Sequence, residues 1–103
     1  MNDVEYFGFV WDKDKAEQNK IKHGISFETA VHIFDDPLLI ETYDVNHSNA
    51  EDRYKYIGTI NNFLILAVIG TDRDGKIRII SARKADRNEE KLYYEKIEKL
   101  QLF

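Results

Sequence analysis

The stretch that decides the fold is Ile77–Arg87, with the sequence IRIISARKADR. Its first residues are rich in β-branched side chains, which is typical of a strand inside a sheet. Asp86, with Glu89 three positions later, has the pattern of a capping box that opens a helix. Arg78 and Arg83 lie on the strand, and a buried arginine needs water, a carboxylate or an anionic ligand. We therefore expect this strand to form the floor of an anion-binding site. The alternative is that both arginines form ordinary salt bridges at the strand ends.

The length of 103 residues indicates one domain, residues 1–103, with a core large enough to fold without disulfides or metals. The chain has no cysteine, which excludes both a disulfide framework and a thiolate metal site. Its start, MNDVEYFGFVW, lacks the features of a signal peptide, and no apolar run is long enough to cross a bilayer. We therefore expect a cytoplasmic protein without membrane contact.

The net charge of −4 argues against a general electrostatic grip on nucleic acid. The charges are unevenly distributed, however, with bases concentrated at 20–23 and 83–87. An acidic protein can still hold a local basic pocket, and such a pocket binds a defined anion rather than coating a polymer.

The N-terminal third predicts one strand and two helices. The aromatic stretch Tyr6–Trp11 is expected to be a single short strand. A helix should follow from an Asp12 cap to about His23, ended by Gly24 in the left-handed conformation. A second helix should begin after the cap Ser26 and end at the breaker 35–37. Its expected apolar face consists of Phe27, Ala30, Val31 and Phe34.

The remainder predicts four strands and a last helix. Strands are expected at 38–43, 53–60, 63–70 and 76–83, with a polar loop at 44–52, and the helix should run from Asp86 to about Leu100. The predicted fold class is α+β, with a small antiparallel sheet flanked by two N-terminal helices and one C-terminal helix.

Two-residue turns at Asn61-Asn62 and Asp74-Gly75 would fix the strand register. They would place Arg53 opposite Gly70 and Arg83 opposite Leu66. Since side chains alternate between faces, one face would carry Arg53, Lys55, Ile79, Ser81 and Arg83, and the other Tyr54, Tyr56 and Arg78.

The polar loop places Asp44, His47, Glu51 and Arg53 within a short distance along the chain. The imidazole of a histidine titrates near neutral pH, so His47 could act as an acid–base group, with Glu51 orienting it. Asp44, His47 and Glu51 could instead hold a divalent ion, and a loop histidine that simply points to solvent is the structural alternative.

Further bases could contact an anion. Lys22 and His23 close the first predicted helix, where the helix dipole alone explains a cation. Arg87 falls in the first turn of the last helix, where the dipole disfavours a cation, which favours a ligand or partner role. Together these residues suggest a phosphate-handling pocket. With RNA as substrate no metal is required, because a 2′-hydroxyl can attack the adjacent phosphate once a base removes its proton.

The ordered motifs resemble the BrnT family of bacterial type II toxins over about residues 6–94. They are Phe9-Val10-Trp11-Asp12, Asn19 with Lys22-His23-Gly24-Ile25, Phe27-Glu28-x-Ala30, Phe34-x-Asp36-Pro37, Asp44, His47-Ser48, Glu51, Arg53, Ile57-Gly58 and Arg78–Ala85. The resemblance implies a RelE-like fold and a ribonuclease that cleaves mRNA and blocks translation. It also implies a cognate BrnA-type antitoxin, through which alone the complex would bind operator DNA.

Residues and resemblance together give one candidate site without metal or cofactor. Its catalytic members are His47, Glu51, Arg53 and Arg83, and its RNA- or phosphate-binding members are Lys22, His23, Arg78 and Arg87. Two other hypotheses remain: a catalytically inactive RNA- or protein-binding domain of the same fold, and a metal-dependent phosphodiesterase built on Asp44, His47 and Glu51.

Overall fold

The molecule is built on one six-stranded sheet, which the computed structural model describes within residues 2–101. The strand order is β1-β2-β6-β5-β4-β3. The strands are β1 (Asp3–Tyr6), β2 (Phe9–Asp12), β3 (Ile40–Tyr43), β4 (Tyr54–Ile60), β5 (Leu64–Arg73) and β6 (Lys76–Lys84). The helical elements are α1 (Lys13–His23), α2 (Phe27–Ala30), the 3-10 turns η1 (Val31–Asp35) and η2 (Val45–His47), and α3 (Arg87–Gln101). The predicted α+β class is confirmed.

The N-terminal segment corrects two expectations. Instead of one strand at 6–11, β1 and β2 form an antiparallel hairpin with Tyr6 opposite Phe9. The turn between them is made by Phe7 and Gly8, both with positive φ, of 48° and 87°. β2 then pairs in parallel with β6, so the sheet is mixed and larger than the small antiparallel sheet expected.

The helix ends follow the local sequence signals. The Asp12 side chain accepts a hydrogen bond from the backbone N–H of Lys15, and Gly24 ends α1 with a φ of 71°. Ser26 caps α2 in the same way, through the N–H of Thr29. Asp86 and Glu89 form the predicted capping box, with reciprocal backbone-to-side-chain hydrogen bonds of 2.8 Å.

The strand register differs from the predicted one by single residues. The loop between β4 and β5 contains Asn61, Asn62 and Phe63, because Ile60 pairs with Leu64. Tyr54, rather than Arg53, therefore lies opposite Gly70.

A bulge in β6 causes the second difference. Next to the predicted Asp74-Gly75 turn the register is as expected, but Gly70 pairs with Ile79 while Ile69 pairs with Ser81. Arg83 therefore lies opposite Ala67 instead of Leu66. The extra residue in the β4–β5 loop places Ile79 on the face of Tyr56 and Arg78 on the face of Lys55, and the bulge keeps Ser81 and Arg83 on the face of Lys55, as predicted.

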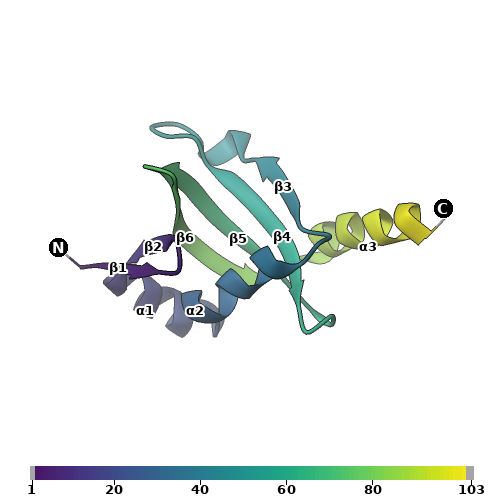
Figure 1. Ribbon diagram of the computed structural model, residues 1–103, viewed down its shortest axis with the longest axis horizontal. Coiled ribbons are helices and arrows are strands. Elements are labelled where there is room, and N and C mark those ends of the chain that lie inside the picture. Colours follow the sequence, from purple (N-terminus) through teal and green to yellow (C-terminus); the bar gives the residue numbers. More distant parts are fainter. Residues whose placement is uncertain (1, 102–103) are drawn as a thin grey trace.

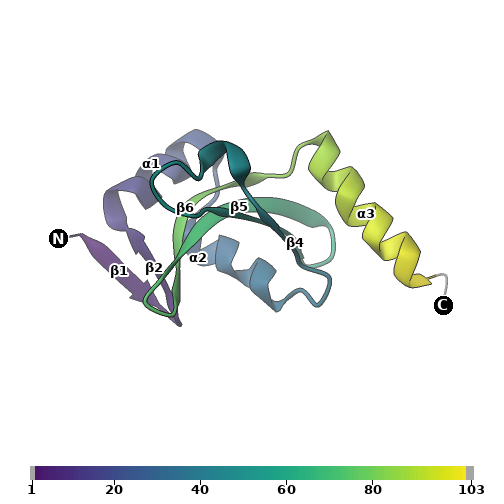
Figure 2. The same cartoon turned by 90° about the horizontal axis from the view of Figure 1, so that it is seen from above.

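Each face of the sheet has its own core. The larger core contains Tyr56, Leu66, Val68, Ile79 and Ala82, and is covered by residues of β2, α2 and η1 that include Trp11, Phe27 and Ile33. The opposite face contains a smaller core of Ile57, Ile65 and Tyr93 of α3. Figure 2 shows α3 beyond the β4 end of the sheet, so α3 covers only part of this second face. The remainder stays open to solvent.

The molecule is elongated, with extents of 49 × 26 × 24 Å. Figure 1 shows why: α3 points away from the sheet at the opposite end of the molecule from β1. Of the helices within residues 2–101, none has the length and apolar character needed to span a bilayer.

Candidate functional site

A pocket of about 310 Å³ lies on the open part of the sheet face, beside α3 and under the loop that follows β3. Its lining residues come from that loop and from the three longest strands; they are Asp44, Asn46, His47, Arg53, Lys55, Ile69, Ile80, Ser81 and Arg83. The pocket therefore brings together three of the four predicted catalytic residues, His47, Arg53 and Arg83.

The loop is fixed by Ser48. Its hydroxyl donates to the backbone oxygen of Asp44 at 2.6 Å and accepts from the backbone N–H of Arg53 at 2.9 Å. The backbone N–H of Asp44 also donates to the backbone oxygen of Arg53 at 2.8 Å. These bonds close the loop and hold His47 and Arg53 at the same pocket.

His47 is oriented by Asp44. Its Nδ1 lies 2.9 and 3.1 Å from the two carboxylate oxygens of Asp44, whose side chain is only 10% exposed, while the imidazole is 66% exposed. A carboxylate only accepts hydrogen bonds, so Nδ1 carries the proton and the neutral ring keeps Nε2 as a free acceptor. Such a ring is suited to removing a proton from a substrate.

Glu51, which was expected to orient His47, has a different place. Its carboxylate lies 3.0 Å from Nη2 of Arg73 and 3.7 Å from Nη2 of Arg53, and it is not part of the pocket lining. The expected orienting role of Glu51 is therefore wrong. Since Glu51 faces arginines, the proposed set of Asp44, His47 and Glu51 does not come together; no group of His, Asp or Glu within residues 2–101 has a geometry suited to a metal ion.

Arg53 and Arg83 both line the pocket, but they differ in their hydrogen-bond and ion-pair partners. The Nε of Arg53 is buried and has no hydrogen-bond partner among the described residues. Arg83 donates to both oxygens of Glu89, at 2.7 and 3.0 Å, and this bond raises the pKa of Arg83. The ion pair of Arg53 is longer, with its Nη2 3.7 Å from Glu51, and its side chain is 33% exposed, so Arg53 has the more obvious capacity for an anion.

Lys55 and Glu89 complete the site and were not among the predicted site residues. The Nζ of Lys55 lies 2.8 Å from the carboxylate of Glu89, and Lys55 lines the pocket. Burial raises the pKa of Glu89, but hydrogen bonds from Arg83 and Lys55 outweigh burial and lower it to about 2. Lys55 follows Arg53 by two residues in the predicted strand 53–60, so the two side chains were expected on one face, and this could have identified Lys55 as a site residue. The sequence predicted Glu89 only as part of the capping box.

The four predicted RNA- or phosphate-binding residues do not line this pocket. Lys22 and His23 end α1, whose Asn19 contacts the backbone of β6 at Ala82. Arg78 forms a bidentate bond with Asp3 at 3.0 and 3.1 Å, which raises the pKa of Arg78, so this arginine is a salt-bridged strand residue as the alternative interpretation held. Arg87 is exposed on the first turn of α3.

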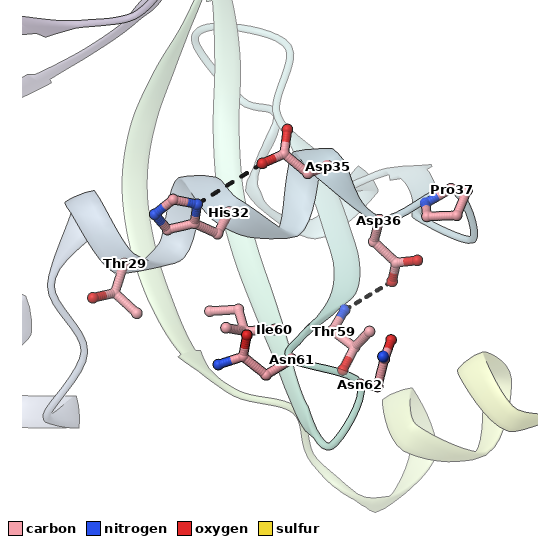
Figure 3. A pocket seen from close by; sticks show the side chains of 9 residues that line it. All are labelled: Thr29, His32, Asp35, Asp36, Pro37, Thr59, Ile60, Asn61 and Asn62. Carbon is pink, nitrogen blue, oxygen red and sulfur yellow. Dashed lines mark hydrogen bonds and ion pairs between the residues drawn. The ribbon is translucent and has the colours of Figure 1, made fainter.

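A larger cavity of about 590 Å³ lies between α2–η1 and the β4–β5 turn (Figure 3). Its lining contains no lysine or arginine; it consists of Thr29, His32, Asp35, Asp36, Pro37, Thr59, Ile60, Asn61 and Asn62. In Figure 3 the carboxylate of Asp36 accepts from the backbone N–H of Thr59, at 2.9 Å, and His32 faces Asp35. Acidic lining repels phosphate, so the smaller basic pocket is the better candidate for an anion.

Comparisons with known proteins identify a family and a similar solved structure. Residues 11–89 match the family described as the ribonuclease toxin BrnT of type II toxin–antitoxin systems. Among solved structures, the chain is similar to the crystal structure of the Brucella abortus ribonuclease toxin BrnT, with 29% sequence identity and a TM-score of 0.56. That match covers 75% of this chain and 94% of the Brucella protein. A search of curated proteins found no significant match.

Family membership carries two consequences for this chain: a toxin activity on RNA and an antitoxin as partner. The chain belongs to the BrnT family of ribonuclease toxins from type II toxin–antitoxin systems.

Proposed function

We propose that this toxin cleaves mRNA without a metal ion and thereby blocks translation, and that the pocket of His47, Arg53, Lys55 and Arg83 is its active site. The observation that carries the proposal is the pairing of an oriented imidazole with three cations in one pocket. RNA supplies its own nucleophile, the 2′-hydroxyl, so the protein needs a base and positive charge near the phosphate.

The reaction can be written with these groups. Nε2 of His47 takes the proton of the 2′-hydroxyl, and the 2′-oxygen attacks the adjacent phosphorus. The bond from phosphorus to the 5′-oxygen breaks, and that oxygen takes up a proton. The products are a 2′,3′-cyclic phosphate and a 5′-hydroxyl. Arg53, Lys55 and Arg83 stabilise the charge that develops on the phosphate oxygens.

We propose that a BrnA-type antitoxin neutralises the toxin, and that contact with operator DNA occurs only through their complex. The net charge of −4 supports the second point, because it disfavours direct contact with a DNA duplex.

The first experiment is tight inducible expression of the chain, with and without the neighbouring gene, while growth, bulk translation and mRNA cleavage by primer extension are followed. We expect arrest and cleavage that the neighbouring gene relieves. His47→Ala should lower the cleavage rate of the purified protein by about 10²- to 10⁴-fold, the usual contribution of a general base. His32→Ala is the matched control, since His32 is 60% exposed in the acidic cavity, and it should cleave like the wild type.

Three results would contradict parts of the proposal. A fully active His47→Ala protein would remove the assigned base. Activity lost on addition of a chelator would show a metal requirement. Folded wild-type protein that binds RNA but leaves it intact, even at high protein excess, would favour an RNA-binding domain that has no catalytic activity.

A further inference from the structure

Glu89 is held by three hydrogen bonds and one ion pair. One oxygen accepts from Nη1 of Arg83 at 2.7 Å and from the backbone N–H of Asp86 at 2.8 Å; the other accepts from Nη2 of Arg83 at 3.0 Å and forms an ion pair with Nζ of Lys55 at 2.8 Å. Both oxygens are therefore surrounded by donors and positive charge. The Glu89 side chain is 5% exposed. Glu89 therefore has no capacity left for a substrate proton, and any role in catalysis is indirect.

The two cations come from strands that are not neighbours. Lys55 lies on β4 and Arg83 on β6, with β5 between them. Both side chains stand on the same face, because Lys55 pairs with Ile69 and Ile69 pairs with Ser81, two residues from Arg83. The carboxylate of Glu89 bridges the middle strand from α3 and draws the two cations together at the pocket.

Both cations keep donors for a ligand. A guanidinium has five N–H groups, and the bond with Glu89 uses two of the groups of Arg83. The ammonium of Lys55 has three, of which Glu89 receives one. A phosphate in the pocket can therefore be contacted without breaking the ion pairs.

The capping box does not explain the negative charge. At this helix position glutamine caps as well as glutamate, because either side chain can accept the backbone N–H of Asp86. The helix dipole favours an anion in this first turn, but it acts on Glu90 as well; the contacts with Arg83 and Lys55 are particular to Glu89.

We propose that Glu89 is a positioning residue of the active site, which holds Arg83 and Lys55 as one phosphate-binding pair. The inference rests on the proposed function of the pocket. It assigns Lys55 as a contact to the scissile phosphate and α3 as the element that aligns the two strands' cations.

The test compares Glu89→Gln with Glu90→Gln in steady-state cleavage of a short RNA at constant salt. Both variants lose one negative charge from α3, but Glu90 is exposed and does not line the pocket. Glu89→Gln should lower kcat by about ten- to a hundredfold, since misplacement of about 1 Å costs that much. Its KM should fall, because the cations lose a competing anion. Loss of folded protein alone would not lower KM.

Two outcomes would overturn the inference: a Glu89→Gln protein with wild-type kcat, or an equal loss in Glu90→Gln. If wild-type protein cleaves no RNA, the proposed function fails. Binding of inorganic pyrophosphate to the wild type and to Glu89→Gln then tests the inference about Glu89. In the wild type the side-chain NMR signals of both Arg83 and Lys55 should shift when pyrophosphate binds, whereas in Glu89→Gln one of the two signals should no longer respond. Shifts of both signals in both proteins would show that Glu89 does not hold the two cations as a pair.

Discussion

Glu89 and Arg53 are charged residues beside one pocket, but their surroundings differ. Glu89 is buried and held by three hydrogen bonds and an ion pair with Lys55, whereas Arg53 is half-buried and its terminal Nη2 lies 3.7 Å from Glu51. A buried charge with close partners stabilises the fold around it, and a half-buried, loosely paired cation can take up an anion. We therefore assign fold and alignment to Glu89 and phosphate contact to Arg53.

Acid unfolding should report the state of Glu89. The pKa of Glu89 is lowered from 4.5 to about 2, so its contribution to stability is fully present above pH 4.5 and is lost as the pH falls toward 2. The shift corresponds to about 3 kcal/mol. Urea unfolding of wild type and Glu89→Gln at several pH values measures it. The wild type should lose about 3 kcal/mol more than the variant over this interval, and parallel curves would contradict the assignment.

The orientation of His47 shows what residue patterns leave open. The loop contains two acids within reach of His47, and the sequence favoured Glu51. The structure selects Asp44, because the hydroxyl of Ser48 closes the loop and leaves Asp44 one helical turn before His47. Arg53 and Arg73 attract Glu51 instead, and Arg73 is distant in sequence. The sequence predicted that an acid orients His47. Which acid does so depended on the contact of Glu51 with Arg73 of β5, which is distant in sequence.

At the level of elements, adjacent residues were sufficient to predict the helix ends. The register and pairing of the strands join distant residues, and the sequence predicted them only in part. The caps at Asp12, Gly24, Ser26 and Asp86 depend on a few adjacent residues, and all four are confirmed. The register depends on single residues in the β4–β5 loop and on the bulge in β6, so a difference of one residue changed which side chains pair. The parallel pairing of β2 with β6 joins distant parts of the chain and has no local signal at all.

Asn19 joins α1 to the sheet and provides a test at this level. Its amide donates to the backbone oxygens of Ile25 and Ala82, and its oxygen accepts from the N–H of Ala82. Asn19→Ala leaves these buried groups unpaired, at about 1–3 kcal/mol per group before relaxation. We expect a loss of about 3 kcal/mol in the free energy of unfolding in urea. Gln18→Ala, an exposed neighbour on the same helix, should change it by less than about 0.5 kcal/mol. Equal effects would contradict the role of Asn19.

At the level of the whole molecule, acids accompany most of the bases on the sheet. Arg78 pairs with Asp3, Lys76 with Glu5, and Arg73 with Glu51. These exposed pairs add little stability, but they reduce the positive potential around the pocket. The net charge of −4 is therefore compatible with RNA binding that depends on a few cations in one place.

The salt dependence of RNA binding should be correspondingly weak. For single strands, log K falls with log salt with a slope of about −0.7 for each neutralised phosphate. The slope should therefore lie between about −0.7, if the three cations share one phosphate, and about −2, if each neutralises its own. Fluorescence anisotropy with a 2′-O-methyl RNA, which binds but lacks the attacking hydroxyl, measures this slope. Arg53→Gln should make it less negative by up to about 0.7. Lys76→Gln, outside the pocket and paired with Glu5, should leave it unchanged. A wild-type slope beyond about −4 would mean six or more phosphate contacts, and the RNA would then bind across the sheet rather than in one pocket.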